Sequence, residues 1–174
     1  SCNGLTDGEI TVNAFGGTSP YLYSVNGGAY HANMAYFWGY GPGTYTVEVL
    51  DSNNCAAQDI IIIEEPDVLD VTITTSNWNG YEVKCNGDNS GYANILINGG
   101  NGPCLKTVYD AASNIIYNGN SPIINNLSAG MYTFVITDSN GCTYSESLLY
   151  QEPTVITHSF VIDHISCTGW TNGS

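Results

Sequence analysis

The feature of this sequence that most limits its fold is an internal duplication. Cysteine-led openings begin at Cys2, Cys85 and Cys167, which lie 83 and 82 residues apart. Further along, GTYTVEVLDSNNC (residues 43–55) aligns without a gap with GMYTFVITDSNGC (residues 130–142), and a Glu-Pro pair follows each segment. Self-similarity of this period indicates tandem structural units. The predicted divisions are a first unit at residues 1–66, a second unit at residues 67–153, and a leading strand with the start of a next unit at residues 154–174.

Each unit has the sequence pattern of β-strands. Apolar residues alternate with polar ones in both copies, which is the period of a strand with one buried face. The alternating positions are Ile10, Val12, Ala14, Tyr45, Val47 and Val49 in the first unit and Ala93, Ile95, Ile97, Tyr132, Phe134 and Ile136 in the second. DSNN and DSNG are tight-turn sequences because Asn and Gly tolerate positive φ, and IIIIEEP (residues 60–66) has the pattern of a buried strand ended by proline. We predict an all-β fold of tandem, antiparallel, immunoglobulin-like β-sandwich domains.

Charge and motif content exclude several function classes. The chain has sixteen acidic residues against two lysines and no arginine, a net charge of -14, and contacts to phosphate require cations. No apolar run approaches the ~20 residues of a membrane helix. G-x-S-x-G, H-E-x-x-H and phosphate-binding glycine loops are missing from the sequence, and the adjacent Glu64 and Glu65 would face opposite sides of a strand. We expect no enzyme, no nucleic-acid partner and no membrane insertion.

The order of these motifs resembles the SprB-type repeat. The shared phrases are C-x-G, G-G-x-x-P-Y (residues 16–21), the G-x-Y-T-x-x-V-x-D-S-N-x-C hairpin and the closing E-P. They cover two tandem copies and the start of a third. Such repeats occur in tandem in very large surface adhesins of Bacteroidota, including gliding adhesins that type IX secretion exports. The resemblance implies a secreted, extracellular or cell-surface location and a role in cell adhesion or surface structure.

Six cysteines in an acidic chain of this class favour disulfides. In the alignment Cys2 corresponds to Cys85 and Cys55 to Cys142. We therefore predict the pairs Cys2–Cys55 and Cys85–Cys142, one within each unit. Each bond would close a loop of more than fifty residues, which is worth about 3–4 kcal/mol in the chain-entropy description. Metal binding is the less favoured alternative, because no C-x-x-C spacing is present.

Two cysteines are left over by this pairing. Cys104 stands where the first unit, like the SprB-type family, has tyrosine (Tyr21), and Cys167 opens the third copy. Either Cys104 is a buried, unpaired thiol and Cys167 awaits a partner in a following unit, or the two are linked across neighbouring subunits.

The number of leading strands does not match the number of units. Val68, Val71 and Ile73 form a strand-like run before Cys85, and residues 154–166 occupy the same place after the second unit. No such segment precedes Cys2. Either the sequence is a piece of a longer tandem array, or the last strand docks onto the first unit of a neighbouring subunit. Strand addition at an open sheet edge that does not close on itself gives a filament.

These observations predict a structural or adhesive extracellular repeat protein. It would be part of a bacterial surface adhesin or filament assembled head to tail from immunoglobulin-like units, with copies of itself or adjacent repeats as partners. The alternative is a carbohydrate-binding module that contacts surface glycans through an aromatic loop at residues 30–41, whose rings can instead cap the core or form a subunit interface. The aromatic residues are Tyr30, Tyr36, Phe37, Trp38 and Tyr40.

Two further kinds of site are predicted on weaker patterns. Asp-Ser-Asn at Ser52 and Ser139 resembles the sites at which Bacteroidota O-glycosylate exported proteins, which would make the chain a glycoprotein; the same triplet is also good hairpin chemistry. Acidic residues gather where the units join, and carboxylates there can hold Ca²⁺ or remain solvated. These residues are Glu64, Glu65, Asp67 and Asp70. No other metal or cofactor is expected.

Overall fold

The computed structural model describes residues 1–32 and 34–162 of the chain. These residues form thirteen strands. The strands are β1 (Gly8–Thr11), β2 (Leu22–Val25), β3 (His31–Ala32), β4 (Tyr36–Tyr40), β5 (Gly43–Leu50), β6 (Ala56–Ile63), β7 (Asp70–Thr75), β8 (Gly91–Asn98), β9 (Leu105–Tyr109), β10 (Ile115–Gly119), β11 (Ile123–Leu127), β12 (Gly130–Thr137) and β13 (Thr143–Tyr150). Within the described part of the chain, no helix has the length and apolar character to cross a membrane.

The strands form four antiparallel sheets, two in each unit. In the first unit β1 pairs with β4, and a second sheet has the order β3-β2-β5-β6. In the second unit the sheets have the orders β11-β8-β7 and β10-β9-β12-β13. The two units therefore share one plan, except that β7 has no counterpart among the described residues of the first. The prediction of an all-β fold of antiparallel, immunoglobulin-like sandwiches is confirmed.

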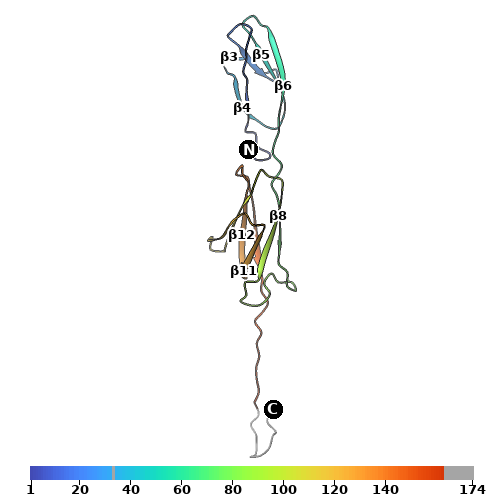
Figure 1. Cartoon of the computed structure of the whole chain (residues 1–174), viewed down its shortest axis with the longest axis vertical. Coiled ribbons are helices and arrows are strands. Elements are labelled where there is room, and N and C mark those ends of the chain that lie inside the picture. The colour runs from blue at the N-terminus through green and yellow to red at the C-terminus, as the bar shows by residue number, and fades with distance from the viewer. Residues whose placement is uncertain (33, 163–174) are drawn as a thin grey trace, which may run out of the picture.

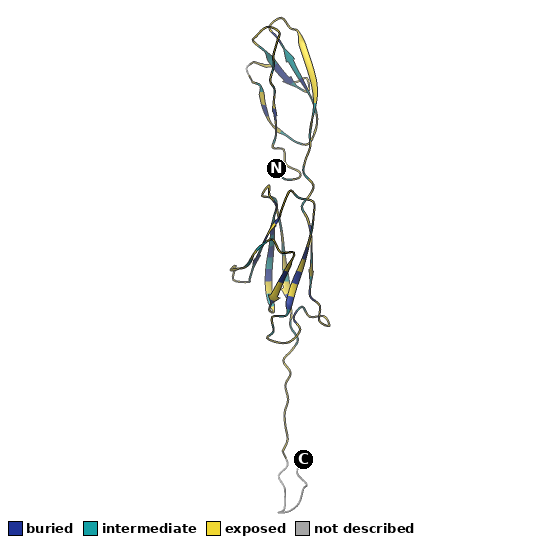
Figure 2. Ribbon diagram, viewed as in Figure 1, coloured by how far each residue is buried: buried dark blue, intermediate teal, exposed yellow. Residues whose placement is uncertain are grey.

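The predicted apolar positions line the cores, but the two cores differ in size. All twelve alternating residues belong to a core or pack against one. Twelve buried residues form the core of the second unit, against four in the first. Figure 2 shows the corresponding bands, in which buried residues alternate mainly with exposed ones along β8 and with intermediate ones along β12. The first unit is the less completely filled sandwich.

One strand is less buried than its sequence predicts. Ile60 and Ile62 of β6 are 62% and 69% exposed, whereas Ile61 and Ile63 pack against the core. The prediction of a fully buried strand at residues 60–66 is therefore wrong. β6 lies at the edge of its sheet, and one face of such an antiparallel sheet remains in water.

The two units lie end to end, and the N-terminus lies at the junction between them (Figure 1). In each unit we call the end that carries the Asp-Ser-Asn loop the hairpin end, and the end that carries the Glu-Pro pair the exit end. Residues 154–162 form no strand and run away from the exit end of the second unit.

Candidate functional site

The exit end of each unit is closed by the same set of hydrogen bonds. In the first unit the Gly4 amide donates to Glu65 Oε2 at 2.8 Å, and Asn3 Nδ2 donates to the Pro66 carbonyl at 2.9 Å. The equivalent donors of the second unit are the Gly87 amide to Glu152 Oε2 at 2.7 Å, and Asn86 Nδ2 to Glu152 Oε1 at 2.7 Å and to the Pro153 carbonyl at 3.2 Å. These contacts hold the leading cysteine of each unit beside the end of its last strand. The repeated Cys-Asn-Gly and Glu-Pro motifs were the sequence signal for this contact.

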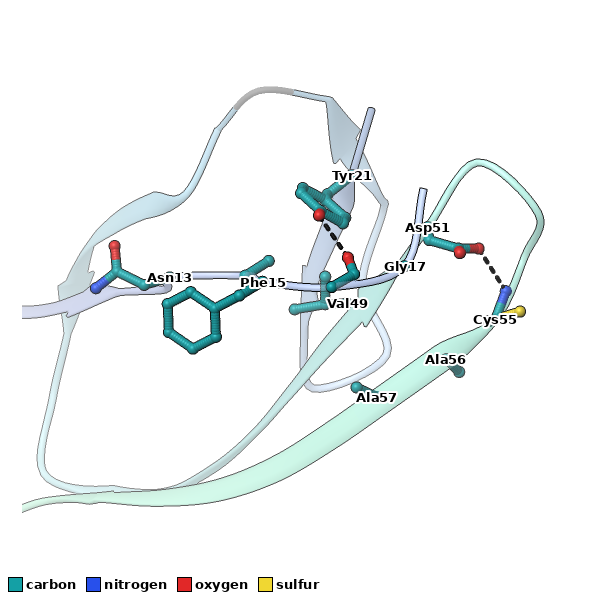
Figure 3. Close-up of a pocket in the computed structure, with 11 residues that line it drawn as sticks. Asn13, Phe15, Gly17, Tyr21, Val49, Asp51, Cys55, Ala56 and Ala57 are labelled. Atoms are coloured by element: carbon teal, nitrogen blue, oxygen red, sulfur yellow. Dashed lines mark hydrogen bonds between the residues drawn. The ribbon is translucent and has the colours of Figure 1, made fainter. Parts of the chain in front are cut away.

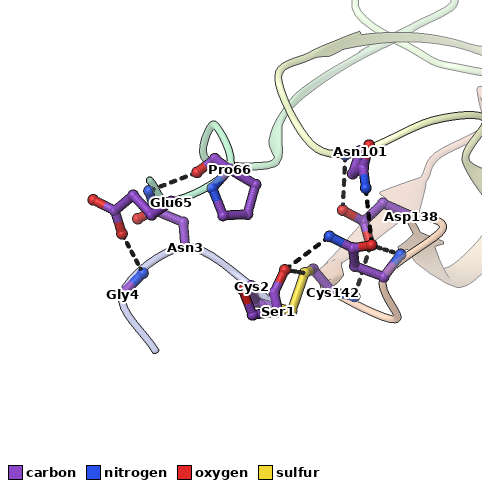
Figure 4. Close-up of a disulfide and its surroundings, with 10 residues drawn as sticks. Ser1, Cys2, Asn3, Gly4, Glu65, Pro66, Asn101, Asp138 and Cys142 are labelled. Carbon is purple, nitrogen blue, oxygen red and sulfur yellow. Dashed lines mark hydrogen bonds between the residues drawn. A yellow bond between two sulfur atoms is a disulfide. The ribbon is translucent and has the colours of Figure 1, made fainter. Parts of the chain in front are cut away.

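A disulfide joins the exit end of the first unit to the hairpin end of the second. Cys2 is bonded to Cys142, with the two Cα atoms 5.5 Å apart (Figure 4). Beside this bond, Asn140 Nδ2 donates to the Ser1 carbonyl at 2.8 Å. The junction is therefore held by a covalent bond between side chains as well as by the connecting backbone.

The predicted pairs Cys2–Cys55 and Cys85–Cys142 are wrong. Within each unit the two cysteines lie at opposite ends of the last strand, β6 or β13, and each of these strands has eight residues. Eight extended residues span about 26 Å, whereas a disulfide requires Cα atoms within about 7 Å. Stacking the units end to end places the exit end of one against the hairpin end of the next, and this contact brings Cys2 to Cys142.

The hairpin end of the first unit is organised by one carboxylate. Asp51 Oδ1 accepts from the amides of Cys55 at 2.9 Å and Asn53 at 2.8 Å, and its Oδ2 accepts from the Thr18 amide at 3.0 Å. The hydrogen bond from the Cys55 backbone, with those from Thr18 and Asn53, holds the pKa of Asp51 below its ordinary value of 3.8, although burial acts in the opposite direction.

The hairpin end of the second unit has the same arrangement. Asp138 Oδ1 accepts from the amides of Cys142 at 2.8 Å and Asn140 at 2.9 Å, and its Oδ2 accepts from the Asn101 amide at 2.9 Å. Burial favours a higher pKa for Asp138, but the backbone hydrogen bonds outweigh it and leave the pKa lowered. The loop conformation that presents Cys142 for bonding is thus also present around Cys55.

The leading segment of the second unit (residues 67–75) fills a groove beside β8. Its strand β7 pairs along β8, and Leu69 packs against the core. A side chain added at Gly99 would overlap the Val68 carbonyl, and one at Gly100 would lie 2.9 Å from Leu69 Cδ1. Two glycines are needed here because the leading segment passes directly over them.

The corresponding place in the first unit is an open pocket of about 330 Å³ (Figure 3). Gly16, which corresponds to Gly99, has nothing within 4 Å of the position of an added side chain. Phe15 beside it is 89% exposed. The lining residues are Asn13, Ala14, Phe15, Gly16, Gly17, Tyr21, Val49, Asp51, Cys55, Ala56 and Ala57. The pocket marks the position that a leading segment fills in the second unit.

Three cysteines are free among the described residues. Cys55 and Cys85 are exposed, and Cys104 is buried with its Sγ 3.7 Å from the Gly102 carbonyl. Cys104 therefore packs as a buried thiol at the position of Tyr21. Cys167 lies outside the described residues.

The predicted aromatic loop is formed largely by β3 and β4, and its rings divide between core and surface. Phe37 is buried, and Tyr40 packs against the same core. Tyr30, Tyr36 and Trp38 are 40%, 45% and 76% exposed. Only these three rings are available to a ligand.

The remaining predicted sites are placed as follows. Ser52 and Ser139 are exposed in the hairpin loops, and the Ser139 hydroxyl lies 3.4 Å from the Pro103 carbonyl. The acidic residues at the junction are not assembled as an ion site, since within residues 1–32 and 34–162 no three Asp, Glu, His or Cys side chains gather around one point. The carboxylate of Glu65 instead accepts a hydrogen bond from the Gly4 amide.

Comparison with known proteins found one family model that matches part of the chain. Residues 1–30 match the family model of the SprB repeat. Among solved structures, the chain is similar to the C-terminal 282-residue fragment of intimin in complex with the translocated intimin receptor (Tir) intimin-binding domain, at 15% identity and a TM-score of 0.39, covering 75% of this chain and 51% of that one. The chain thus spans about half the length of that fragment. No curated protein matches the chain. The match over residues 1–30 confirms the resemblance to the SprB-type repeat in that part of the chain.

Proposed function

We propose that this chain is a structural, adhesive repeat protein of the bacterial cell surface, in which sandwich units assemble head to tail into a longer fibre. The SprB-type repeat supports an extracellular adhesin role. The observation that carries the proposal is the difference between the two units: the groove that a leading segment fills in the second unit is an open pocket in the first.

The segment that would fill the open pocket is present after the second unit. Counted from the two Glu-Pro pairs, Ile156 corresponds to Leu69 and Phe160 to Ile73. Ile156 is 93% and Phe160 80% exposed, whereas Leu69 and Ile73 pack against a core. Complete burial of such a side chain contributes about 1.5–3 kcal/mol, and the partial burial seen for Leu69 and Ile73 contributes less. Residues 154–162 of one chain therefore act as the leading segment of the next first unit along the fibre.

The proposed route is strand addition, and it is directional. β1 is paired on one side with β4, and its other edge, which β7 occupies in the second unit, has no strand within the described residues. An incoming segment gains backbone hydrogen bonds from that edge and a pocket for its side chain. Because the donor and the acceptor lie at opposite ends of the chain, the contact propagates instead of closing a dimer.

Sedimentation of the full chain in reducing buffer tests this assembly. The weight-average mass should rise above 18.6 kDa with protein concentration, and fibres should appear by electron microscopy. Ile156→Asp should abolish the increase, because a charge cannot enter the apolar pocket. Ile62→Asp is the matched control, since Ile62 is already 69% exposed on β6. A monomeric mass at every concentration, or assembly that survives Ile156→Asp, would contradict the proposal.

Carbohydrate binding is a second candidate function. The 76% exposure of Trp38 beside the 45% exposed Tyr36 favours it, because exposed rings stack on sugar faces. Binding on a glycan array that is lost with Trp38→Ala and retained with Trp78→Ala, a substitution of a 40% exposed tryptophan in the second unit, would support this role. If the chain binds no glycan on the array, the result would contradict a carbohydrate-binding role.

The extracellular role also includes covalent modification of the hairpin loops. Ser52 and Ser139 are exposed at those loops and are accessible to a glycosylating enzyme. Intact-mass spectrometry of material from the native host should show sugar masses that disappear with Ser52→Ala and Ser139→Ala. An unmodified mass in native material would contradict the modification.

A further inference from the structure

The one disulfide among the described residues joins a leading cysteine to a hairpin cysteine. Each of these two positions occurs twice in the described units, and only one copy of each is bonded. Cys2 is the leading cysteine of the first unit, and Cys142 is the hairpin cysteine of the second. The other leading cysteine is Cys85, and the other hairpin cysteine is Cys55; both are free and exposed. Cys85 and Cys55 therefore repeat the two positions of the bonded pair without being bonded. They lie at the two outer ends of the pair of units.

The surroundings of the free cysteines match those of the bonded ones. Cys85 is followed by Asn86 and Gly87, which hold Glu152 just as Asn3 and Gly4 hold the Glu-Pro pair of the first unit. The Cys55 amide donates to Asp51 Oδ1 at 2.9 Å, and the Cys142 amide donates to Asp138 Oδ1 at 2.8 Å. Both cysteines are thus held by hydrogen bonds equivalent to those that hold their bonded counterparts.

The two free thiols lie on the surfaces that the proposed assembly brings together. Cys55 lines the open pocket of the first unit, and Cys85 lies at the exit end of the second, from which residues 154–162 depart. At the junction within the chain, the second unit has both features together: its groove is filled by a leading segment, and its hairpin cysteine, Cys142, is bonded. A segment that enters the open pocket from a neighbouring chain would bring Cys85 of that chain to Cys55.

We propose that Cys85 and Cys55 are the two halves of a repeating junction disulfide, through which the second unit of one chain is bonded to the first unit of a second copy. This inference rests on the proposed head-to-tail assembly. It assigns every leading and hairpin cysteine of the described units to a bond between units and none to a bond within a unit. The result is a covalently continuous fibre.

The bond requires an oxidant, and a small-molecule disulfide such as oxidised glutathione supplies it. The Cys85 thiolate attacks one glutathione sulfur, so that a mixed disulfide forms and one glutathione thiolate leaves. The Cys55 thiolate of the second copy then attacks the Cys85 sulfur, and the second glutathione leaves. Two protein thiols are oxidised and one glutathione disulfide is reduced to two thiols.

The full chain carrying Cys104→Ser and Cys167→Ser, which removes the two remaining cysteines, is the background for the test. In a glutathione redox buffer this protein should form a ladder of multiples of its mass on a non-reducing gel. Mass spectrometry should find peptides that link Cys55 to Cys85. Adding Cys55→Ser or Cys85→Ser alone should abolish the ladder, while a mixture of these two variants should give a covalent dimer and no longer species.

The outcomes separate this inference from the assembly on which it rests. A chain that associates in reducing buffer but forms no Cys55–Cys85 peptide on oxidation would overturn the disulfide and leave the assembly standing. Cys55–Cys55 and Cys85–Cys85 peptides as abundant as the mixed one would also overturn it, because they indicate random thiol collisions. A chain that neither associates nor cross-links would overturn both.

Discussion

Cys2 and Cys142 are bonded to each other although 140 residues separate them. The bond attaches the loop that precedes the first strand of one sandwich to the last hairpin loop of the other. It therefore restrains the angle between the units, while the core of each unit is held by its own packing.

Removing this bond should loosen the junction without unfolding either unit. For the Cys2→Ser/Cys142→Ser double variant we expect small-angle X-ray scattering to show a broader distribution of distances than in the parent chain. Circular dichroism should be unchanged. Cys85→Ser is the control and should leave the scattering of the monomer as it is. Scattering curves that superimpose for the parent chain and the double variant would show that the backbone contacts alone fix the junction.

Substitution of Gly99 should be costlier than substitution of Gly16. Both have positive φ, at 67° and 74°, so alanine costs each about 1 kcal/mol of backbone strain. Only at Gly99 does the added methyl group overlap the leading segment, at the Val68 carbonyl, and displacing packed backbone costs a further 1–3 kcal/mol or so. Denaturant unfolding of Gly99→Ala and Gly16→Ala measures the difference, and equal losses would contradict the groove.

The two units should unfold separately, the first at the lower temperature. Its core has four buried residues against twelve, and within residues 1–32 and 34–162 it has no strand equivalent to β7. Phe37 and Phe134 are matched probes, since they are 6% and 0% exposed in the two cores. Each Phe→Ala change should cost about 3–5 kcal/mol. In calorimetry Phe37→Ala should lower only the first transition and Phe134→Ala only the second, whereas one transition shifted by both would contradict independent units.

Acid should destabilise both hairpin ends. Because the pKa of Asp51 and of Asp138 is lower in the folded chain than the ordinary 3.8, their ionised forms stabilise the fold above that pH. This contribution is lost as the pH falls from 3.8 through the lowered values. Asp138→Asn should therefore be less stable than the parent at neutral pH and should depend less on pH between about 5 and 3. The same pH slope in both proteins, measured by denaturant unfolding, would contradict a lowered pKa at Asp138.

Much of the fold was predictable from local patterns. The alternation at Tyr132, Phe134 and Ile136 gave a strand and its buried face, because neighbouring side chains on a strand point to opposite sides. The duplication gave two units of one kind, and a leading strand was correctly expected before Cys85, where β7 lies. The exposure of Ile60 and Ile62 was not predictable in this way, since it depends on the outer face of their sheet being left uncovered in water.

The candidate site was likewise predictable only in part. The sequence by itself determined that leading and hairpin cysteines recur and that Asp51 and Asp138 begin tight turns. Only the tertiary structure decided that Cys2 meets Cys142 and that the first unit has an open pocket lined by Cys55. Strand periodicity is a local property of the chain, whereas the partner of a cysteine depends on which ends of the units are in contact. That contact is set by end-to-end stacking, and no spacing within one unit encodes it.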